Sequence, residues 1–262
     1  MVIPCIDMKI ILIGAGNLAT QLAVALQKKG MTPAYIYSRT RESAEQLSER
    51  LRDVPYSTDI SRVPTDGDLY IFAVKDSALL DLVSRMPSNR GLWVHTAGSM
   101  DMEVFAPYTA RYGVFYPMQT FSKERETDFD DIPIFVETNH TDDTERLQKL
   151  AGRLSTKVYE APSEQRKYLH LAAVFACNFS NHLYALCDRI LSEHGLPFET
   201  MLPLIRETAA KVADMPPAQA QTGPAIRYDK NVIDKQMALL SDPTMRQIYD
   251  LMSRSIHETN KH

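Results

Sequence analysis

Short apolar runs alternate with amphipathic stretches over residues 1–160 of the chain. The apolar runs have the length and composition of buried strands, and they fall at residues 9–13, 34–37, 69–74, 92–95, 113–115 and 134–137. The amphipathic stretches predict helices at residues 17–29, 42–52, 77–85 and 143–154, with Asp76 as the N-cap of the third. Strands that alternate with helices indicate a parallel sheet covered by helices on both faces.

The strand pattern ends near Ala161, and only helical patterns follow it. Ser163 is expected to cap a helix that runs to Gly195. The middle of this helix is apolar nearly all round, so we expect it to be central and buried, because a surface helix has one polar face. Further helices are predicted at residues 201–212, 232–240 and 244–256, the last with Pro243 in its first turn. The sequence thus predicts an α/β Rossmann-type domain over residues 1–160 and an all-helical domain over residues 161–262.

A glycine-rich turn follows the first predicted strand and leads directly into the first helix. It reads Gly14-Ala15-Gly16-Asn17-Leu18-Ala19. Gly14 permits the tight turn, Gly16 lets the backbone approach a pyrophosphate at the helix N-terminus, and Ala19 allows close packing of strand and helix. We therefore expect the residues from Gly14 to Leu18 to bind a dinucleotide. The alternative is a tight turn that binds nothing.

The end of the second predicted strand indicates which dinucleotide this is. NAD enzymes commonly carry an acidic residue there, which accepts hydrogen bonds from the ribose hydroxyls. This chain has Ser38-Arg39-Thr40-Arg41 and no acid before Glu42. A guanidinium binds a 2′-phosphate through charge-assisted hydrogen bonds. We predict NADP(H) as the cofactor, with Ser38, Arg39 and Thr40 at the phosphate; the alternative is that Arg39 and Arg41 form a solvated helix start.

Composition and charge exclude several classes of partner. The chain has 262 residues and a formal charge of −4, so it has no general attraction to nucleic acid or to an anionic membrane. No apolar run reaches the roughly 18 residues of a membrane span. The first seven residues lack the pattern of a signal peptide, and we expect them to form a short extension.

The cysteines favour a reducing compartment. They are Cys5, Cys177 and Cys187, an odd number without a CxxC pair. On one predicted helix, Cys177 and Cys187 would lie about 15 Å apart, which is too far for a disulfide. We therefore expect a cytoplasmic protein. No Cys/His cluster has the spacing of zinc ligands, so no metal site is predicted.

Six segments spread over nearly the whole chain carry a family resemblance. They are Gly14-Ala15-Gly16-Asn17, Ser38-Arg39-Thr40, Ala73-Val74-Lys75-Asp76, His95-Thr96-Ala97-Gly98-Ser99, Tyr116-Pro117-Met118-Gln119-Thr120-Phe121 and Thr222-Gly223-Pro224-Ala225-Ile226-Arg227-Tyr228-Asp229. The chain resembles the phosphogluconate dehydrogenase-like superfamily, which includes pyrroline carboxylate reductases and hydroxyisobutyrate dehydrogenases. It is most similar to a group of NADP oxidoreductases in which a Rossmann-like domain precedes a helical domain of unknown function. The resemblance implies NADP and a helical domain of the phosphogluconate dehydrogenase C-terminal type, but no particular substrate.

The resemblance also implies which turns line the nicotinamide side of the cleft. These turns follow the third and fourth strands, and their residues are Ala73, Val74, Lys75, Thr96, Ala97 and Gly98. The position agrees with the general rule that ligands of open α/β sheets bind beyond the carboxyl ends of the strands. The alternatives are structural: Asp76 caps the following helix, Lys75 is a solvated charge and Gly98 only permits the turn.

The first long helix of the second domain departs from the family pattern. Hydroxyacid dehydrogenases of the superfamily place a lysine four residues before an asparagine there; this chain has Asn178 but Val174 in place of the lysine. This departure argues against ordinary hydroxyacid oxidation. His170, Cys177, Asn178 and Asn181 fall within roughly a 100° sector of the helix, and such a polar stripe must face something polar. We predict catalytic roles for His170 and Asn178; internal hydrogen bonds or a subunit interface are the alternatives.

Tyr116 and Gln119 are further catalytic candidates. They are placed in the loop after a predicted strand, where the domains and the cleft would meet. A phenol hydroxyl and an amide can orient or protonate a carbonyl or an imine. Packing within the loop is the alternative for both residues.

These observations favour an NADP-dependent oxidoreductase that reduces a small carbonyl or imine compound. The alternative is a non-catalytic nucleotide-binding or scaffold protein that keeps the fold, which the missing lysine supports. We also expect a homodimer formed mainly by the helical domain, because a domain of this size would struggle to cover an all-round apolar helix alone.

Overall fold

The structure is a computed structural model that describes residues 8–260. Cys5 and the expected N-terminal extension lie outside the described residues. The chain divides into two compact units, one ending at Cys177 and the other beginning at Asn178. This division falls within the long helix, whereas the domain boundary expected from the sequence, after residue 160, precedes that helix.

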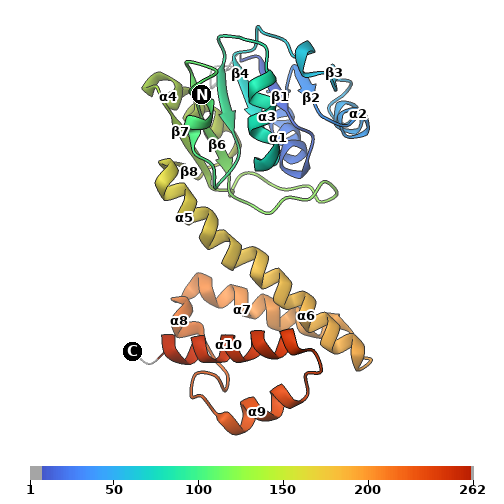
Figure 1. Cartoon of the computed structure of the whole chain (residues 1–262), viewed down its shortest axis with the longest axis vertical. Helices are drawn as coiled ribbons and strands as arrows, with labels where there is room; N and C mark the ends of the chain where they lie inside the picture. Colours follow the sequence, from blue (N-terminus) through green and yellow to red (C-terminus); the bar gives the residue numbers. More distant parts are fainter. Residues whose placement is uncertain (1–7, 261–262) are drawn as a thin grey trace. The chain divides into compact units, whose positions relative to one another are not determined.

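The described residues of the first unit form one sheet of eight strands in the order β3-β2-β1-β4-β5-β6-β7-β8 (Figure 1). The strands are β1 (Ile10–Ile13), β2 (Tyr35–Tyr37), β3 (Tyr56–Ser57), β4 (Leu69–Phe72), β5 (Leu92–His95), β6 (Tyr112–Pro117), β7 (Ile134–Thr138) and β8 (Val158–Glu160). The six expected strands are all present, and the two short edge strands β3 and β8 were not expected.

One strand pair departs from the expected parallel sheet. β7 pairs antiparallel with β6, while every other neighbouring pair in the sheet is parallel. The connection from Met118 to Pro133 contains no helix that could carry a parallel crossover, so the chain returns beside β6 in the opposite direction. The sheet is therefore mixed at this edge.

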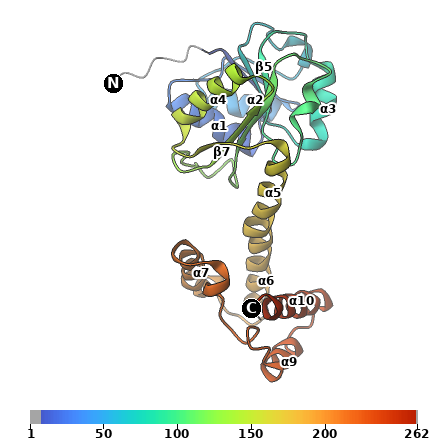
Figure 2. The same cartoon turned by 90° about the vertical axis from the view of Figure 1, so that its left-hand side faces the viewer.

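Helices cover both faces of the sheet, as the sequence predicts. In β1, Ile10 and Leu12 belong to one buried cluster, and Ile11 and Ile13 belong to another on the opposite face. The first cluster includes α1 (Asn17–Lys28), α2 (Arg41–Arg50) and α4 (Thr141–Leu154), and the second includes α3 (Asp76–Arg85). Figure 2 shows α1, α2 and α4 on one side of the strands and α3 on the other.

Two of the expected helix caps are wrong by one residue. Asp76 is the first residue of α3, which has Lys75 at its N-cap, and the Asp76 carboxylate accepts a hydrogen bond from Ser99. Ser163 opens the next helix after an N-cap at Pro162, and its hydroxyl donates to a glutamate on β7. In both cases the capping side chain is engaged in a tertiary contact instead of with its own helix.

The long helix is not a uniform α-helix and is not buried within this chain. It consists of α5 (Ser163–Ala173), a π-helical segment (Val174–Phe179) and α6 (Ser180–Glu193), and Gly195 follows it with a φ of 69°. Neither the π-helical segment nor α6 contains a buried residue. The expectation of a central, buried helix is therefore wrong for the π-helical segment and α6 of the single chain.

The second unit contains four further α-helices within the described residues. They are α7 (Leu202–Asp214), α8 (Pro217–Ala220), α9 (Lys230–Ala238) and α10 (Pro243–Thr259). Pro243 opens α10, as expected, and the Asp242 carboxylate caps that helix by accepting from the amide of Thr244 at 2.7 Å. Between residues 8 and 260, no helix has both the length and the apolar character needed to cross a bilayer.

Candidate functional site

Four parallel strands end at one edge of the sheet. β1 pairs with β4, β4 with β5 and β5 with β6, and the last residues of the first three, Ile13, Phe72 and His95, lie in register. The turns that follow these strands therefore meet at this edge, together with the end of β6. Ligands of open α/β sheets bind at such an edge.

The glycine-rich turn after β1 is built for close approach. Gly14 has a φ of 125°, and a Cβ at this position would lie 2.2 Å from the carbonyl oxygen of Ala73. The amide of Gly14 donates to the carbonyl oxygen of Tyr37 at 2.7 Å. Ala19 is fully buried, which agrees with the expected close packing of strand and helix. Gly16 is the N-cap of α1, and a Cβ there would meet open space.

The loop between β6 and β7, residues 118–133, lies along α1. Asn17 Nδ2 donates to the carbonyl oxygen of Phe121 at 3.0 Å. Gln21 is buried; its Nε2 donates to the carbonyl oxygen of Ser122 at 2.6 Å, and its Oε1 accepts from the amide of Thr127 at 3.2 Å. The loop is thus attached to the first two turns of the helix that begins at the glycine-rich turn. The sequence analysis did not anticipate this attachment.

The end of β2 presents a guanidinium without a carboxylate partner. The amide of Ser38 donates to the carbonyl oxygen of Ser57, and its side chain is buried. Arg39 and Thr40 are exposed, and no ion pair to Arg39 exists within residues 8–260. Arg41 lies 4.0 Å from Glu45. Arg39 is therefore the cation of this segment that remains available to an anion.

The turns after β4 and β5 hold the remaining expected cofactor residues. The amide of Ala73 donates to the carbonyl oxygen of Ile13 at 2.8 Å. The amide of Thr96 donates to the carbonyl oxygen of Phe72 at 3.2 Å. Val74 is half-buried and Lys75 is exposed. These backbone bonds place the turn after β4 beside the turn after β1, and the turn after β5 beside the turn after β4. Their role in binding the cofactor stays a prediction.

His95 holds the turn after β5 in shape. Its Nδ1 accepts from the amide of Ala97 at 3.2 Å, so the ring proton lies on Nε2, which donates to the carbonyl oxygen of Asp101 at 3.3 Å. Burial, and to a smaller extent the charge of the nearby Arg166 guanidinium, lowers the pKa of His95 to about 4. The imidazole is therefore neutral at physiological pH. Sequence reasoning missed this role.

Tyr116 and His170 form a hydrogen-bonded pair. Tyr116 Oη lies 3.1 Å from His170 Nδ1, and the rings are close to perpendicular. Tyr116 lies in β6, so its expected placement in a following loop is wrong; β6 extends two residues beyond the predicted strand. The side chain of Tyr116 is buried, and this burial raises the pKa of the phenol. The charge of Arg166 lowers the same pKa, but by less.

Gly98 brings the turn after β5 against His170. A Cβ at Gly98 would lie 2.6 Å from His170 Nδ1, which is closer than side-chain atoms approach. The next residue, Ser99, donates its hydroxyl hydrogen to Asp76 Oδ2 at 2.5 Å. Gly98, Tyr116 and His170 thus meet at the carboxyl edge of the sheet, with a carboxylate nearby on α3.

Two expected catalytic residues are not part of this cluster. Gln119 is exposed, and its Oε1 accepts from the amide of Thr120 at 2.8 Å. Asn178 is exposed, lies in the π-helical segment and begins the second unit. The expected polar stripe assumed 3.6 residues per turn between His170 and Asn181, and the π-helical segment breaks that spacing. The catalytic roles of Gln119 and Asn178 stay predictions.

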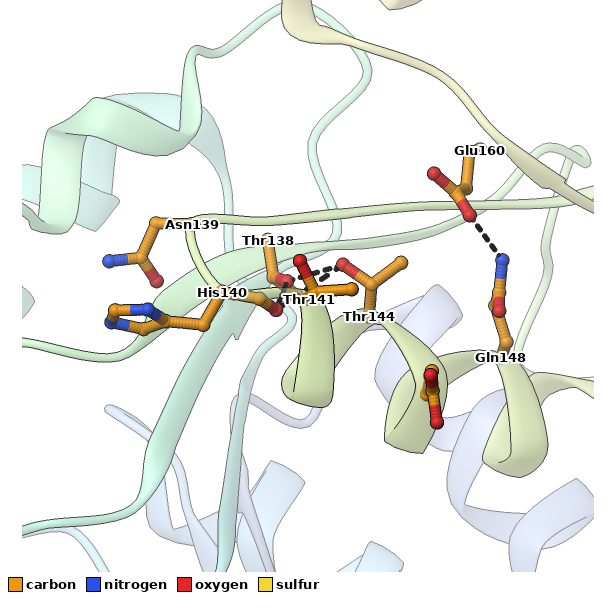
Figure 3. Close-up of a pocket in the computed structure, with 8 residues that line it drawn as sticks. Thr138, Asn139, His140, Thr141, Thr144, Gln148 and Glu160 are labelled. Atoms are coloured by element: carbon orange, nitrogen blue, oxygen red, sulfur yellow. Dashed lines mark hydrogen bonds between the residues drawn. The ribbon is translucent and has the colours of Figure 1, made fainter.

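A hollow of the first unit lies at the opposite end of the strands, away from the glycine-rich turn. It has a volume of about 490 Å³ and surrounds the N-terminus of α4 (Figure 3). Its polar groups are engaged with one another: Thr138 with Thr144 at 2.6 Å, and Gln148 with Glu160 at 2.6 Å. Two acids that line it, Glu145 and Glu160, oppose binding of an anion there.

The described residues contain no group of three or more His, Cys, Asp or Glu side chains that is arranged to hold a metal ion. Cys177 and Cys187 are free thiols.

Comparison with known families gives a match for each half of the chain. A Rossmann-like domain matches residues 3–118, and a domain of unknown function, DUF2520, matches residues 132–256. The chain is 52% identical to a Bacteroides fragilis protein of solved structure, described as a "putative NADP oxidoreductase"; the match covers 96% of this chain and 98% of that chain, with a TM-score of 0.90. The chain therefore belongs to the same family as this Bacteroides fragilis protein. The expected fold, a Rossmann-type domain followed by a helical domain, is confirmed.

More distant structures share the fold. A reductive aminase from Aspergillus terreus, solved with NADPH and ethyl levulinate, is 16% identical over 96% of this chain and 94% of that chain, with a TM-score of 0.73. An imine reductase from Myxococcus stipitatus, solved with NADP+, is 18% identical over 97% of this chain and 94% of that chain, with a TM-score of 0.69. No curated protein sequence matches the chain.

The neutral state of His95 predicts a specific loss of stability in acid. The folded-state pKa, about 4, lies below the value of 6.5 for an unperturbed histidine, so the folded protein binds fewer protons between these pH values. The stabilisation is complete above pH 6.5 and is lost as the pH falls towards 4, by about 3 kcal/mol at about 1.4 kcal/mol per pKa unit. Urea unfolding at several pH values measures this loss.

The matched variants for this experiment are His95→Gln and His140→Gln. Glutamine does not titrate, so His95→Gln should reduce the pH dependence of the unfolding free energy by the amount above. His140 is exposed, so His140→Gln controls for the loss of a histidine outside the core. Equal pH dependence in the wild type and in His95→Gln would contradict the assignment.

Proposed function

We propose that this protein is an NADP-dependent oxidoreductase that reduces a small carbonyl or imine compound. The observation that carries the proposal is the meeting of the glycine-rich turn, the Gly98 turn and the Tyr116–His170 pair at one edge of the sheet. The description of the Bacteroides fragilis relative supports the same class.

The residues at the glycine-rich turn fit a dinucleotide. The space beyond Gly16 is open, and any side chain at this position would occupy it. The first turn of α1 contains no acidic residue, so its amide groups and helix dipole favour a pyrophosphate. Asn17 and Leu18, at the start of α1, and the turns after β4 and β5 would complete the binding surface.

Arg39 favours NADP over NAD. Its guanidinium has no carboxylate partner among the described residues, and Ser38 and Thr40 flank it with hydroxyl groups. A 2′-phosphate would supply the missing negative charge through charge-assisted hydrogen bonds.

The Tyr116–His170 pair is suited to deliver the proton of a reduction. NADPH, when bound, supplies the hydride. Tyr116 is buried and its raised pKa keeps the phenol protonated at neutral pH, so it can donate a proton to the carbonyl oxygen or imine nitrogen. His170, 3.1 Å from the phenol oxygen, can return a proton to Tyr116 and exchange it with solvent, because it is only half-buried. Asn178 and Gln119 are proposed to orient the substrate.

The exposed apolar surface of the long helix supports a homodimer. Tyr168 and Leu171 on α5 are 72% and 53% exposed. Further large apolar side chains are exposed along the π-helical segment and α6. We propose that a second copy of the chain covers this surface, since large exposed apolar side chains that gather in one segment often mark a protein–protein contact.

The first prediction concerns cofactor choice. NADPH should bind more tightly than NADH, and Arg39→Ala should weaken NADPH binding at least tenfold while leaving NADH binding nearly unchanged, because a charged hydrogen bond contributes roughly 1.5–3 kcal/mol. Calorimetric titration with both cofactors measures this. Arg50→Ala, at the other end of α2, is the matched control and should keep the wild-type affinities. Equal affinities of the wild type for the two cofactors would remove the argument.

The second prediction concerns the proton donor. After a screen of keto acids, aldehydes and cyclic imines with NADPH, Tyr116→Phe, His170→Ala and Asn178→Ala should each reduce turnover about a hundredfold or more, the usual scale of general acid catalysis. The affinity for NADPH should barely change. Tyr112→Phe is the matched control, because Tyr112 lies on the same strand as Tyr116, β6, and its hydroxyl donates to the exposed Glu103 in the 3-10 helix Met102–Phe105. NADPH binding without turnover of any compound would favour the non-catalytic alternative, and full turnover of His170→Ala would make that histidine structural.

The third prediction concerns assembly. Sedimentation at micromolar concentration should give a dimer, and Leu171→Glu should weaken it because a charge cannot be buried without a partner. Leu80→Glu is the matched control, since Leu80 on α3 is 56% exposed, close to the value for Leu171. A monomeric wild type at this concentration would reject the proposal.

A further inference from the structure

Arg166 is a fully buried cation beside the Tyr116–His170 pair. Its side chain has no exposed surface, and its Nη1 lies 2.5 Å from Glu137 Oε2. Glu137 comes from β7 and is itself mostly buried. A fully buried arginine is rare in proteins, because the guanidinium loses its hydration and must be paired.

Three separate segments meet at this guanidinium. Arg166 Nη2 donates to Ser163 Oγ at 3.0 Å and to the carbonyl oxygen of Met100. The hydroxyl of Ser163 donates to Glu137 Oε2 at 2.8 Å, and its amide donates to Oε1 at 2.9 Å. Ser163 Oγ also accepts from the amide of Met102 at 3.3 Å. The cluster of Arg166, Glu137 and Ser163 thus joins β7, the start of α5 and the segment after the Gly98 turn.

Both sides of the His170 environment are anchored to this cluster. His170 follows Arg166 by four residues in α5, so the two side chains lie on the same face of the helix, one turn apart. Met100, which accepts from Arg166, follows Gly98 by two residues, and Gly98 packs directly against His170. One guanidinium therefore fixes the helix that carries His170 and the turn on which His170 rests.

The charge of Arg166 also acts on Tyr116. It lowers the pKa of the phenol, against the larger effect of burial, and it lowers the pKa of His95. Buried ion pairs contribute little net stability, and Arg166 Nε has no partner within residues 8–260, so stability alone gives a weak reason for this arrangement.

We propose that Arg166 is a positioning residue of the Tyr116–His170 site, which sets His170 against Tyr116 and Gly98 and stabilises the phenolate formed when Tyr116 donates its proton. The inference rests on the proposed function of this pair. In the step concerned, the O–H bond of Tyr116 breaks and its proton passes to the substrate oxygen or nitrogen that gains charge from the hydride. The charge of the guanidinium stabilises the phenolate until His170 returns a proton.

A second arginine–carboxylate pair in the same unit provides a matched comparison. Arg111 donates to both carboxylate oxygens of Asp143, with Nε to Oδ2 at 3.0 Å and Nη2 to Oδ1 at 2.5 Å. Asp143 is buried in α4, so this pair also joins a helix to the sheet. Arg111 is not among the charges that act on Tyr116. Breaking the Arg111–Asp143 ion pair should therefore lower the stability of the fold without changing the pKa of Tyr116.

The test is the ionisation of Tyr116 in the folded protein. Tyrosine labelled with 13C at the ring carbon bonded to oxygen reports each phenol in an NMR pH titration, and Tyr116→Phe assigns the signal. Arg166→Met should raise the pKa of Tyr116 by about one unit, the lower end of the effect of a neighbouring opposite charge. Loosened packing would instead lower this pKa, because burial raises it. Arg111→Met should leave the titration of Tyr116 unchanged.

A second pair of variants keeps the test decisive if Arg166→Met does not fold. Glu137→Gln preserves the shape of the side chain but removes the charge that balances Arg166, so the pKa of Tyr116 should fall. Asp143→Asn is its control and should have no effect on Tyr116. An unchanged pKa in Arg166→Met, an equal shift in Arg111→Met, or a raised or unchanged pKa in Glu137→Gln would show that Arg166 only holds the fold together.

The titration needs neither cofactor nor substrate, so it separates this inference from the proposed function. Once a substrate is known, Arg166→Met should lower kcat about tenfold or more with unchanged affinity for NADPH, and the alkaline limb of its pH profile should move upwards with Tyr116. If Tyr116→Phe keeps full turnover, the proposed proton donor is wrong, whatever the titration shows. If Tyr116→Phe is inactive but the pKa of Tyr116 does not shift as expected in the Arg166 and Glu137 variants, only the role of Arg166 is overturned.

Discussion

The candidate site depends on backbone segments that approach more closely than side chains allow. Gly14 lies against the carbonyl oxygen of Ala73, and Gly98 lies against the imidazole of His170. The first contact places the turn after β1 beside the turn after β4, and the second places the turn after β5 beside α5. A Cβ at either position would separate these neighbours by a steric clash. The parallel register of β1, β4 and β5 brings the segments to one edge, and the two glycines allow them to meet there.

Much of the first unit could be predicted from its sequence, because its determinants are local. The runs of apolar residues gave six of the strands, and the glycine-rich turn gave the start of α1. Tyr116 and His170 were both identified as candidates, but their hydrogen bond could not be predicted, since it joins residues 54 positions apart. Roles for His95 and Arg166 were missed for the same reason: their partners, Asp101 and Glu137, are identified only by tertiary structure.

The errors in the sequence analysis share a physical cause. Asp76 and Ser163 have the right residue types for helix caps, but both are engaged by partners from other segments, Ser99 and Glu137. The antiparallel pairing of β7 follows from the absence of a crossover helix rather than from the pattern of β7 itself. The long helix was expected to be buried because its sequence is apolar, yet its own chain leaves Tyr168 and Leu171 exposed. Residue patterns indicate that a polar group needs a hydrogen-bond partner or that an apolar surface needs to be buried. Only the tertiary structure identifies the residues that meet this need.

The distribution of charge gives the two ends of the proposed site different chemistry. At the end of β2, Arg39 is exposed and forms no ion pair with another residue of the described part of the chain, which suits recognition of a mobile anion from solution. At the Tyr116–His170 pair, the cation is Arg166, fully buried and held by Glu137, which suits a fixed field that acts on one neighbouring group. An exposed cation there would be screened by water and salt, and its effect on the phenol would be small. A buried cation without Glu137 would be too costly to desolvate. The ion pair satisfies both constraints, because it keeps a permanent positive charge close to Tyr116 while preserving the electrical balance of the interior.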